Sequence, residues 1–204
     1  MGSTNKGNWY KLLIEKMDQS IADGHYFEAI FIEYMIIDDR VKSLAKIAGV
    51  DLLLSKDGST DKYPKMLGQL LDDIKDAKAN MTKAPWRLLD YGIPLAPKET
   101  LKVIKKEKYP IKMVKECVCS PRQLINFNKS KSGKYNSAYG DTNSSLIVQI
   151  KKWVNLRNHW MHAAGDDNLT KDEYESIITP LAIDGNSFAR ELCDITIRIK
   201  RAKK

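Results

Sequence analysis

The chain of 204 residues lacks the features that mark several classes of protein. No apolar run reaches the roughly 20 residues that a membrane-spanning helix needs, so we expect no membrane association. The first residues have no apolar stretch behind Lys6, so we expect no secretory signal. The three cysteines are an odd number and do not make a disulfide framework; we expect reduced thiols in a cytoplasmic protein. No Gly-rich phosphate loop and no G-x-S-x-G sequence is present, so neither a nucleotide-binding loop nor acyl transfer is supported.

Strand-like alternation is scarce, whereas apolar residues at helical spacing are frequent, and this predicts an all-α fold. Gly24 and Gly49 are expected to end the first two helices, and Thr170 to Glu173 form a capping box at the start of another. Pro180 and Gly185 are expected to interrupt the helical structure before the last helix begins. Helices are predicted over residues 8–23, 25–48, 145–164 and 187–201. A third helix in chain order is predicted to open at Asp61 with Pro64 in its first turn, and another is predicted to begin at residue 170.

We expect a single domain, with a core of about residues 8–80 and 144–201 and a loop-rich insertion at about 84–143. Residues 98–134 contain ten Lys and one Arg against three Glu, and this segment alone carries the net charge of +8 of the whole chain. Such a stretch is typical of a surface that binds a polyanion, although a solvated, Lys-rich loop has the same composition. The candidate RNA-binding residues are Lys102, Lys105, Lys106, Lys108, Lys112 and Lys115.

The residues best suited to chemistry lie on the predicted helix 145–164. Asn158 and His162 are four residues apart and share a face of that helix, with Arg157 beside them. Histidine is the side chain best suited to proton transfer near neutral pH, and arginine directs two donors toward a phosphate. The 2′-hydroxyl of RNA is itself a nucleophile, so a protein that cleaves RNA need only move protons and stabilise charge on phosphorus.

The run Arg157-Asn158-His159-Trp160-Met161-His162 resembles the R-N-x-x-x-H signature of HEPN ribonucleases. This resemblance implies an antiparallel helical bundle that dimerises and brings two motifs together. It also implies a metal-independent endoribonuclease without a cofactor, acting as a toxin or as an effector in antiviral defence, with an antitoxin or regulatory protein as a possible partner. His162 would be the acid and base, Arg157 the phosphate clamp, and Asn158 an orienting group.

Glu33 falls within the apolar stripe of helix 25–48, a stripe that we expect to include Phe27, Ile30, Phe31, Tyr34, Ile37, Val41 and Leu44. A carboxylate there is costly unless it is paired. It is expected either to pair with Arg40 or to reach the motif helix and position Arg157 or His162.

Two alternatives remain open. Cys117, Cys119, His159 and His162 are ligand types that zinc takes, although C-x-C is a less usual spacing than C-x-x-C. The rival function is a non-catalytic HEPN-like module that binds RNA or a partner protein.

Trp153 and Trp160, seven residues apart, are expected in the core or an interface rather than in base stacking.

Overall fold

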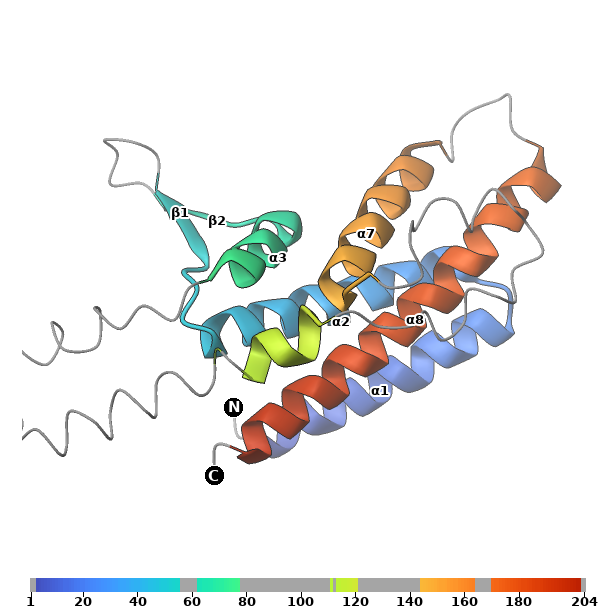
Figure 1. The fold of residues 1–204 in the computed structure, drawn as a ribbon. Helices are drawn as coiled ribbons and strands as arrows, with labels where there is room; N and C mark the ends of the chain where they lie inside the picture. The colour runs from blue at the N-terminus through green and yellow to red at the C-terminus, as the bar shows by residue number, and fades with distance from the viewer. Residues whose placement is uncertain are drawn as a thin grey trace, which may run out of the picture.

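The computed structural model describes residues 3–55, 62–77, 111, 113–120, 144–163 and 170–202. These residues are mostly helical, which confirms the all-α class (Figure 1). No helix within the described ranges combines the length and the apolar character needed to cross a lipid bilayer. The helices are α1 (Ser3–Ala22), α2 (Tyr26–Ile47), α3 (Leu67–Asp76), α7 (Leu146–Ala163) and α8 (Lys171–Ala202), and the strands are β1 (Leu53–Ser55) and β2 (Lys62–Pro64).

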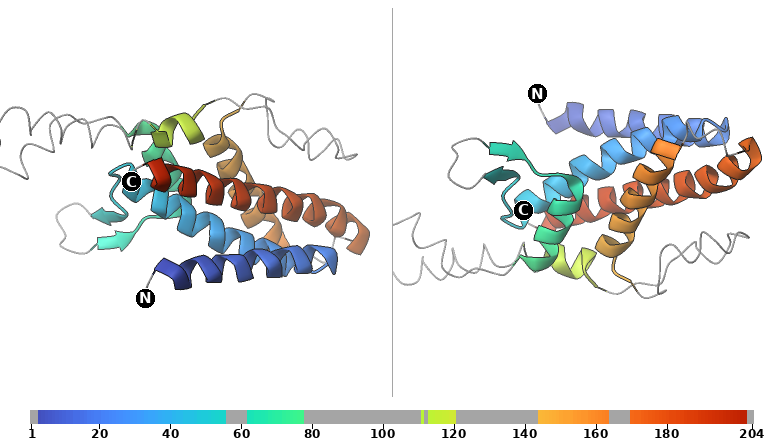
Figure 2. Two further views of the ribbon diagram at one scale, coloured as in Figure 1. Left: turned by 90° about the horizontal axis from the view of Figure 1, so that it is seen from below. Right: turned by 90° about the horizontal axis from the view of Figure 1, so that it is seen from above.

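Three long helices, α1, α2 and α8, form the body of the fold, with α2 between the other two when seen from below (Figure 2). The chain reverses between α1 and α2 at Gly24, which has a φ of 76° that side chains disfavour, and the predicted stop there is confirmed. Lys16 of α1 pairs with Glu28 of α2 at 3.3 Å, and Lys6 pairs with Asp39 at 3.2 Å. The two helices are therefore antiparallel.

In contrast, α2 and α8 run in the same direction. Phe27 stacks on Tyr174 near the start of both helices, with ring centroids 5.5 Å apart. Further along, Glu33 of α2 lies against Gly185 of α8. α7 then returns against α8, because Trp153 donates to the Leu181 carbonyl and Trp160 lies by Tyr174. The bundle thus contains one parallel pair among its long helices, which the simple antiparallel arrangement expected from the sequence does not include.

The final helix corrects the prediction of two helices separated at Pro180 and Gly185. α8 is continuous from Lys171 to Ala202 through both residues. The predicted capping box is present at its start: Glu173 N donates to Thr170 Oγ1 at 3.3 Å and Thr170 N donates to Glu173 Oε2 at 3.1 Å. Leu181, Ala182, Asp184 and Gly185 are all buried. Tertiary packing of this turn therefore outweighs the local preference of Pro and Gly against a helix.

The apolar stripe of α2 is also displaced from the predicted one. Ile30, Ile37, Val41 and Leu44 are buried as expected, but Phe27 and Phe31 are 41% and 55% exposed. The buried face includes Ala29, Ile32, Glu33, Ile36 and Arg40 instead. Because α2 is apolar over most of its circumference, periodicity alone could not identify which side its neighbours cover.

One further correction concerns the middle of the chain. The third helix does not open at Asp61 with Pro64 in its first turn: α3 begins at Leu67, and Pro64 pairs with Leu53 in the antiparallel hairpin of β1 and β2. Asp61 lies outside the described residues. Residues 113–118 are helical, and Ile111, Val114 and Val118 belong to the hydrophobic core. This part of the expected insertion is therefore integrated into the fold.

Candidate functional site

The motif helix, α7, is anchored by its first half. Leu146, Ile150 and Trp153 are fully buried. Trp153 is a core residue, and its indole Nε1 donates a 2.8 Å hydrogen bond to the carbonyl oxygen of Leu181 in α8. Lys151 pairs with Asp72 of α3 at 2.6 Å. These contacts fix the start of α7, so the position of its second half is set by the core.

Arg157 lies in the second half of α7 and turns toward α2. Its guanidinium carbon lies 4.5 Å from the centroid of the Tyr34 ring, a cation–π arrangement. Nη1 donates to Asn158 Oδ1 at 2.9 Å, while the buried Nε has no hydrogen-bond partner. Across the part of the chain that the structure describes, no carboxylate pairs with this guanidinium. An arginine that is held in place but has no counter-ion among the described residues is well suited to bind an anion.

Asn158, His159 and His162 are exposed on α7. The structure brings Arg157 and Asn158 into direct contact, as expected from their adjacency. His162 lies in the last turn and makes no hydrogen bond or ion pair with any described residue. His159 packs edge-on against Trp160, with 4.9 Å between ring centroids. All three polar side chains are therefore accessible from outside the bundle.

Glu33 has neither of the partners expected from the sequence. It is fully buried, and neither of its carboxyl oxygens has a hydrogen-bond partner. It contacts the backbone of Gly185 and lies beside the Trp153 ring, not Arg157 or His162. Burial, reinforced by the charge of Asp184, raises the pKa of Glu33 to about 9. Glu33 is therefore a neutral acid at pH 7.

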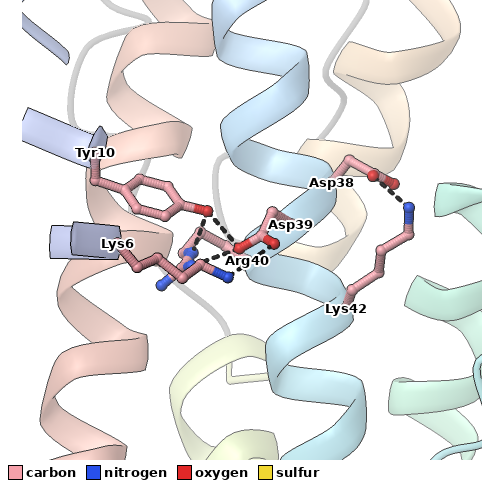
Figure 3. A network of polar contacts seen from close by, with 6 residues as sticks. All are labelled: Lys6, Tyr10, Asp38, Asp39, Arg40 and Lys42. Atoms are coloured by element: carbon pink, nitrogen blue, oxygen red, sulfur yellow. Dashed lines mark hydrogen bonds and ion pairs between the residues drawn. The ribbon is translucent and has the colours of Figure 1, made fainter. Parts of the chain in front are cut away.

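The predicted pair of Glu33 with Arg40 is wrong, because Arg40 faces α1. Figure 3 shows its guanidinium bound to Asp39 and to the Tyr10 hydroxyl, with Lys6 on the same carboxylate. Asp39 accepts hydrogen bonds from Tyr10 and Arg40, and these outweigh desolvation and lower its pKa to about 2. This network joins the start of α1 to Asp39 and Arg40 of α2, which lie five and six residues beyond Tyr34.

Most of the basic segment lies outside the described residues, including Lys102, Lys105, Lys106, Lys108 and Lys112. Lys115 is described, and its ammonium donates a 2.7 Å hydrogen bond to the Ala77 carbonyl at the end of α3. This bond gives Lys115 a structural role at the end of α3.

The alternative zinc site is not assembled. Within the described ranges, no group of three or more His, Cys, Asp or Glu side chains is placed to hold a metal ion. Cys117 and Cys119 are half-buried, and His159 and His162 are exposed on a different helix. Burial raises the pKa of the Cys119 thiol, which disfavours the thiolate that binds zinc.

Helical spacing alone places Tyr34 in the apolar stripe of α2. In the structure its ring supports the guanidinium of Arg157. The residues are 123 positions apart in the chain, and no local pattern links them. Only its hydroxyl, a polar group in an apolar stripe, indicated that Tyr34 lies at the edge of the core.

No model of a known protein family matches this chain, and no curated protein or solved structure matches it significantly. Its function is therefore inferred from the residues of α7 and their surroundings.

Proposed function

We propose that the protein is a metal-independent endoribonuclease of the HEPN type, with Arg157, Asn158 and His162 on α7 as its site. The observation that carries the proposal is the state of Arg157: the guanidinium is held by Tyr34 and Asn158 and has no ionic partner among the described residues. An exposed imidazole, that of His162, lies five residues further along the same helix. A fixed cation and an accessible proton carrier are what cleavage of RNA by its own 2′-hydroxyl requires.

The chemistry follows from these groups. The 2′-oxygen attacks the adjacent phosphorus, the bond from phosphorus to the 5′-oxygen breaks, and the products are a 2′,3′-cyclic phosphate and a 5′-hydroxyl. His162 takes the proton from the 2′-hydroxyl or delivers one to the leaving oxygen. Arg157 neutralises the extra negative charge on the phosphoryl oxygens, and Asn158 keeps its guanidinium oriented. No metal ion is needed for any of these steps.

One copy of His162 cannot be both base and acid in a single concerted transfer. Its exposed place in the last turn of α7 would allow a second copy of the motif, or a regulatory partner, to approach it. A homodimer that joins two α7 helices would supply both imidazoles. By the resemblance to HEPN enzymes, such a nuclease would act as a toxin or a defence effector, restrained by a partner such as an antitoxin.

The test is cleavage of labelled single-stranded RNA in the presence of EDTA. We expect cleavage that survives EDTA, and a rate at least about 100-fold lower in His162→Ala, since general acid–base catalysis contributes factors of this size. His159→Ala is the matched control, because it removes an exposed imidazole from the same helix, three residues away. Arg157→Lys keeps the charge but loses the planar fork and should also be slow.

Equal loss in His159→Ala and His162→Ala, or cleavage that stops in EDTA, would contradict the proposal. Tight binding of RNA with no cleavage between pH 5 and 9, alone and with candidate activating partners, would instead favour the non-catalytic module.

A further inference from the structure

Three aromatic residues of α2 lie on one face of the helix, near the motif. Phe27, Phe31 and Tyr34 are separated by four and three residues, the spacings that bring side chains together along a helix. Phe27 is 41% exposed and Phe31 is 55% exposed. Exposed rings that lie next to one another on a helix face form an apolar patch, and such patches mark binding surfaces more often than single exposed residues do. This row of rings is therefore a candidate surface for binding another molecule.

Both ends of the row are fixed by neighbouring helices. The Phe27 ring stacks on that of Tyr174 in α8, with centroids 5.5 Å apart and planes 16° from parallel. Tyr34 lies beneath the guanidinium of Arg157 in α7. The rings at the ends of the row are thus held before any ligand arrives, which lowers the entropy lost on binding. Phe31, the most exposed, lies between them along α2.

The positive charge of Arg157, next to the row of rings, indicates which kind of molecule binds there. An apolar protein surface would cover Phe27 and Phe31 but would leave Arg157, which has no ionic partner among the described residues, facing an uncharged neighbour. Single-stranded nucleic acid supplies both components, because its bases stack on aromatic rings and its phosphates pair with arginine. Stacking on rings with a cation alongside is the usual way that proteins hold single strands.

We propose that Phe27 and Phe31 form a stacking platform for the bases of single-stranded RNA, placed so that an adjoining phosphate reaches Arg157. This inference rests on the proposed function, since it names how the substrate of that same site is held. The bases next to the cleaved bond stack on α2, and α7 acts on the phosphate. Because any base has a flat face to stack, the platform favours unpaired strands and not a particular sequence.

Binding can be measured without cleavage. The probe is a fluorescein-labelled 2′-O-methyl RNA strand, which lacks the 2′-hydroxyl nucleophile, and its affinity is read by fluorescence anisotropy. A second probe of equal length carries the same phosphates but abasic sugars. Phe31→Ala should weaken binding of the first probe by about 5- to 150-fold, the range for loss of one stacked base. Phe31→Trp should bind as tightly as the wild type. Ile183→Ala, which removes an apolar side chain 46% exposed on α8, is the matched control and should change nothing.

The abasic probe should bind weakly and equally to the wild type and to Phe31→Ala. Unchanged affinity of Phe31→Ala for the base-containing strand would overturn the proposal, as would an equal loss on both probes. If Phe31→Ala lowers the mass measured by light scattering and leaves RNA affinity intact, the row joins two copies of the chain and the proposal is wrong. Binding that behaves as expected, in a protein that never cleaves RNA in EDTA, would support the platform and reject only the catalytic proposal.

Discussion

Gly185 allows a sharp test of how α2, α7 and α8 meet. A Cβ placed on this residue would lie 2.0 Å from Oε2 of Glu33 and 2.6 Å from Cζ2 of Trp153, closer than real Cβ contacts. The Glu33 side chain is flexible but fully buried. The Trp153 ring is rigid, fully buried and tied to the Leu181 carbonyl by a 2.8 Å hydrogen bond. Neither neighbour can move without disturbing the core.

The expected sign of Gly185→Ala is therefore opposite to that of an ordinary helix substitution. Replacing Gly by Ala inside a helix normally stabilises by about 0.5–1 kcal/mol. Overpacking a filled core costs about 1–3 kcal/mol, and two contacts this short place the change toward the upper end. We expect a net loss of about 1–2 kcal/mol and, for a chain of this size, a fall in Tm of about 2–8 °C.

Thermal unfolding followed by circular dichroism at 222 nm measures this difference. Gly7→Ala is the matched control, because Gly7 lies within α1 and a Cβ there would meet no atom within 4 Å. Its Tm should rise by about 1–4 °C. If Gly185→Ala is as stable as Gly7→Ala, the three helices do not pack around Gly185 as described.

Further predictions concern the buried and half-buried ionisable groups. The Glu33 carboxyl has a pKa of about 9 in the fold, above the ordinary value that it regains on unfolding, so stability is highest below that ordinary value and falls as the pH rises toward 9. Glu33→Gln should remove a slope of about 1.4 kcal/mol per pH unit, measured as Tm between pH 5 and 8; an unchanged slope would contradict burial of a neutral acid. Tyr10→Phe removes the hydroxyl that donates to Asp39 and accepts from Arg40, and should cost about 1–2 kcal/mol in urea unfolding at pH 7, whereas no loss would show that the network is unimportant. The pKa of Asp39 is lowered to about 2, so its contribution to stability is present above its ordinary pKa and is lost as the pH falls toward 2; Asp39→Asn should be less stable at pH 7 and lose less than the wild type on acidification to pH 2.

Helix positions were the most predictable feature of the sequence, because they depend on local signals. Gly24 and Gly49 both adopt positive φ values, 76° and 74°, where side chains are disfavoured, and each lies two residues beyond the end of a long helix. The capping box from Thr170 to Glu173 forms as expected. The break expected at Pro180 does not occur, because buried contacts of Leu181 and Gly185 with α2 and α7 hold α8 together.

The faces of the helices were less predictable than their positions. Phe27 and Phe31 look like core residues, but the buried side of α2 carries Glu33 and Arg40. Arg40 can be buried because Asp39 and Tyr10 bind its guanidinium. Glu33 can be buried because it is neutral. These compensations depend on α1 and α8, which no local pattern of α2 reveals.

The candidate site was predictable only as a set of residue types. The motif placed Arg157, Asn158 and His162 on one helix, and the structure has them there. The stacking of Arg157 on Tyr34 joins two helices far apart in the chain, so it depends on tertiary packing. The position of Glu33 against Gly185 and Trp153 likewise results from the meeting of three helices.

The most direct test of the catalytic proposal is the chemistry of the cut ends. An RNA strand cleaved by the protein should yield a 2′,3′-cyclic phosphate and a 5′-hydroxyl, identified by mass spectrometry. A strand with one 2′-deoxy sugar at the cleavage position should remain intact at that bond, since the attacking oxygen is absent there. Both results should depend on His162 and Arg157. Products with 3′-hydroxyl and 5′-phosphate ends, or undiminished cleavage beside the 2′-deoxy sugar, would contradict cleavage through the 2′-oxygen.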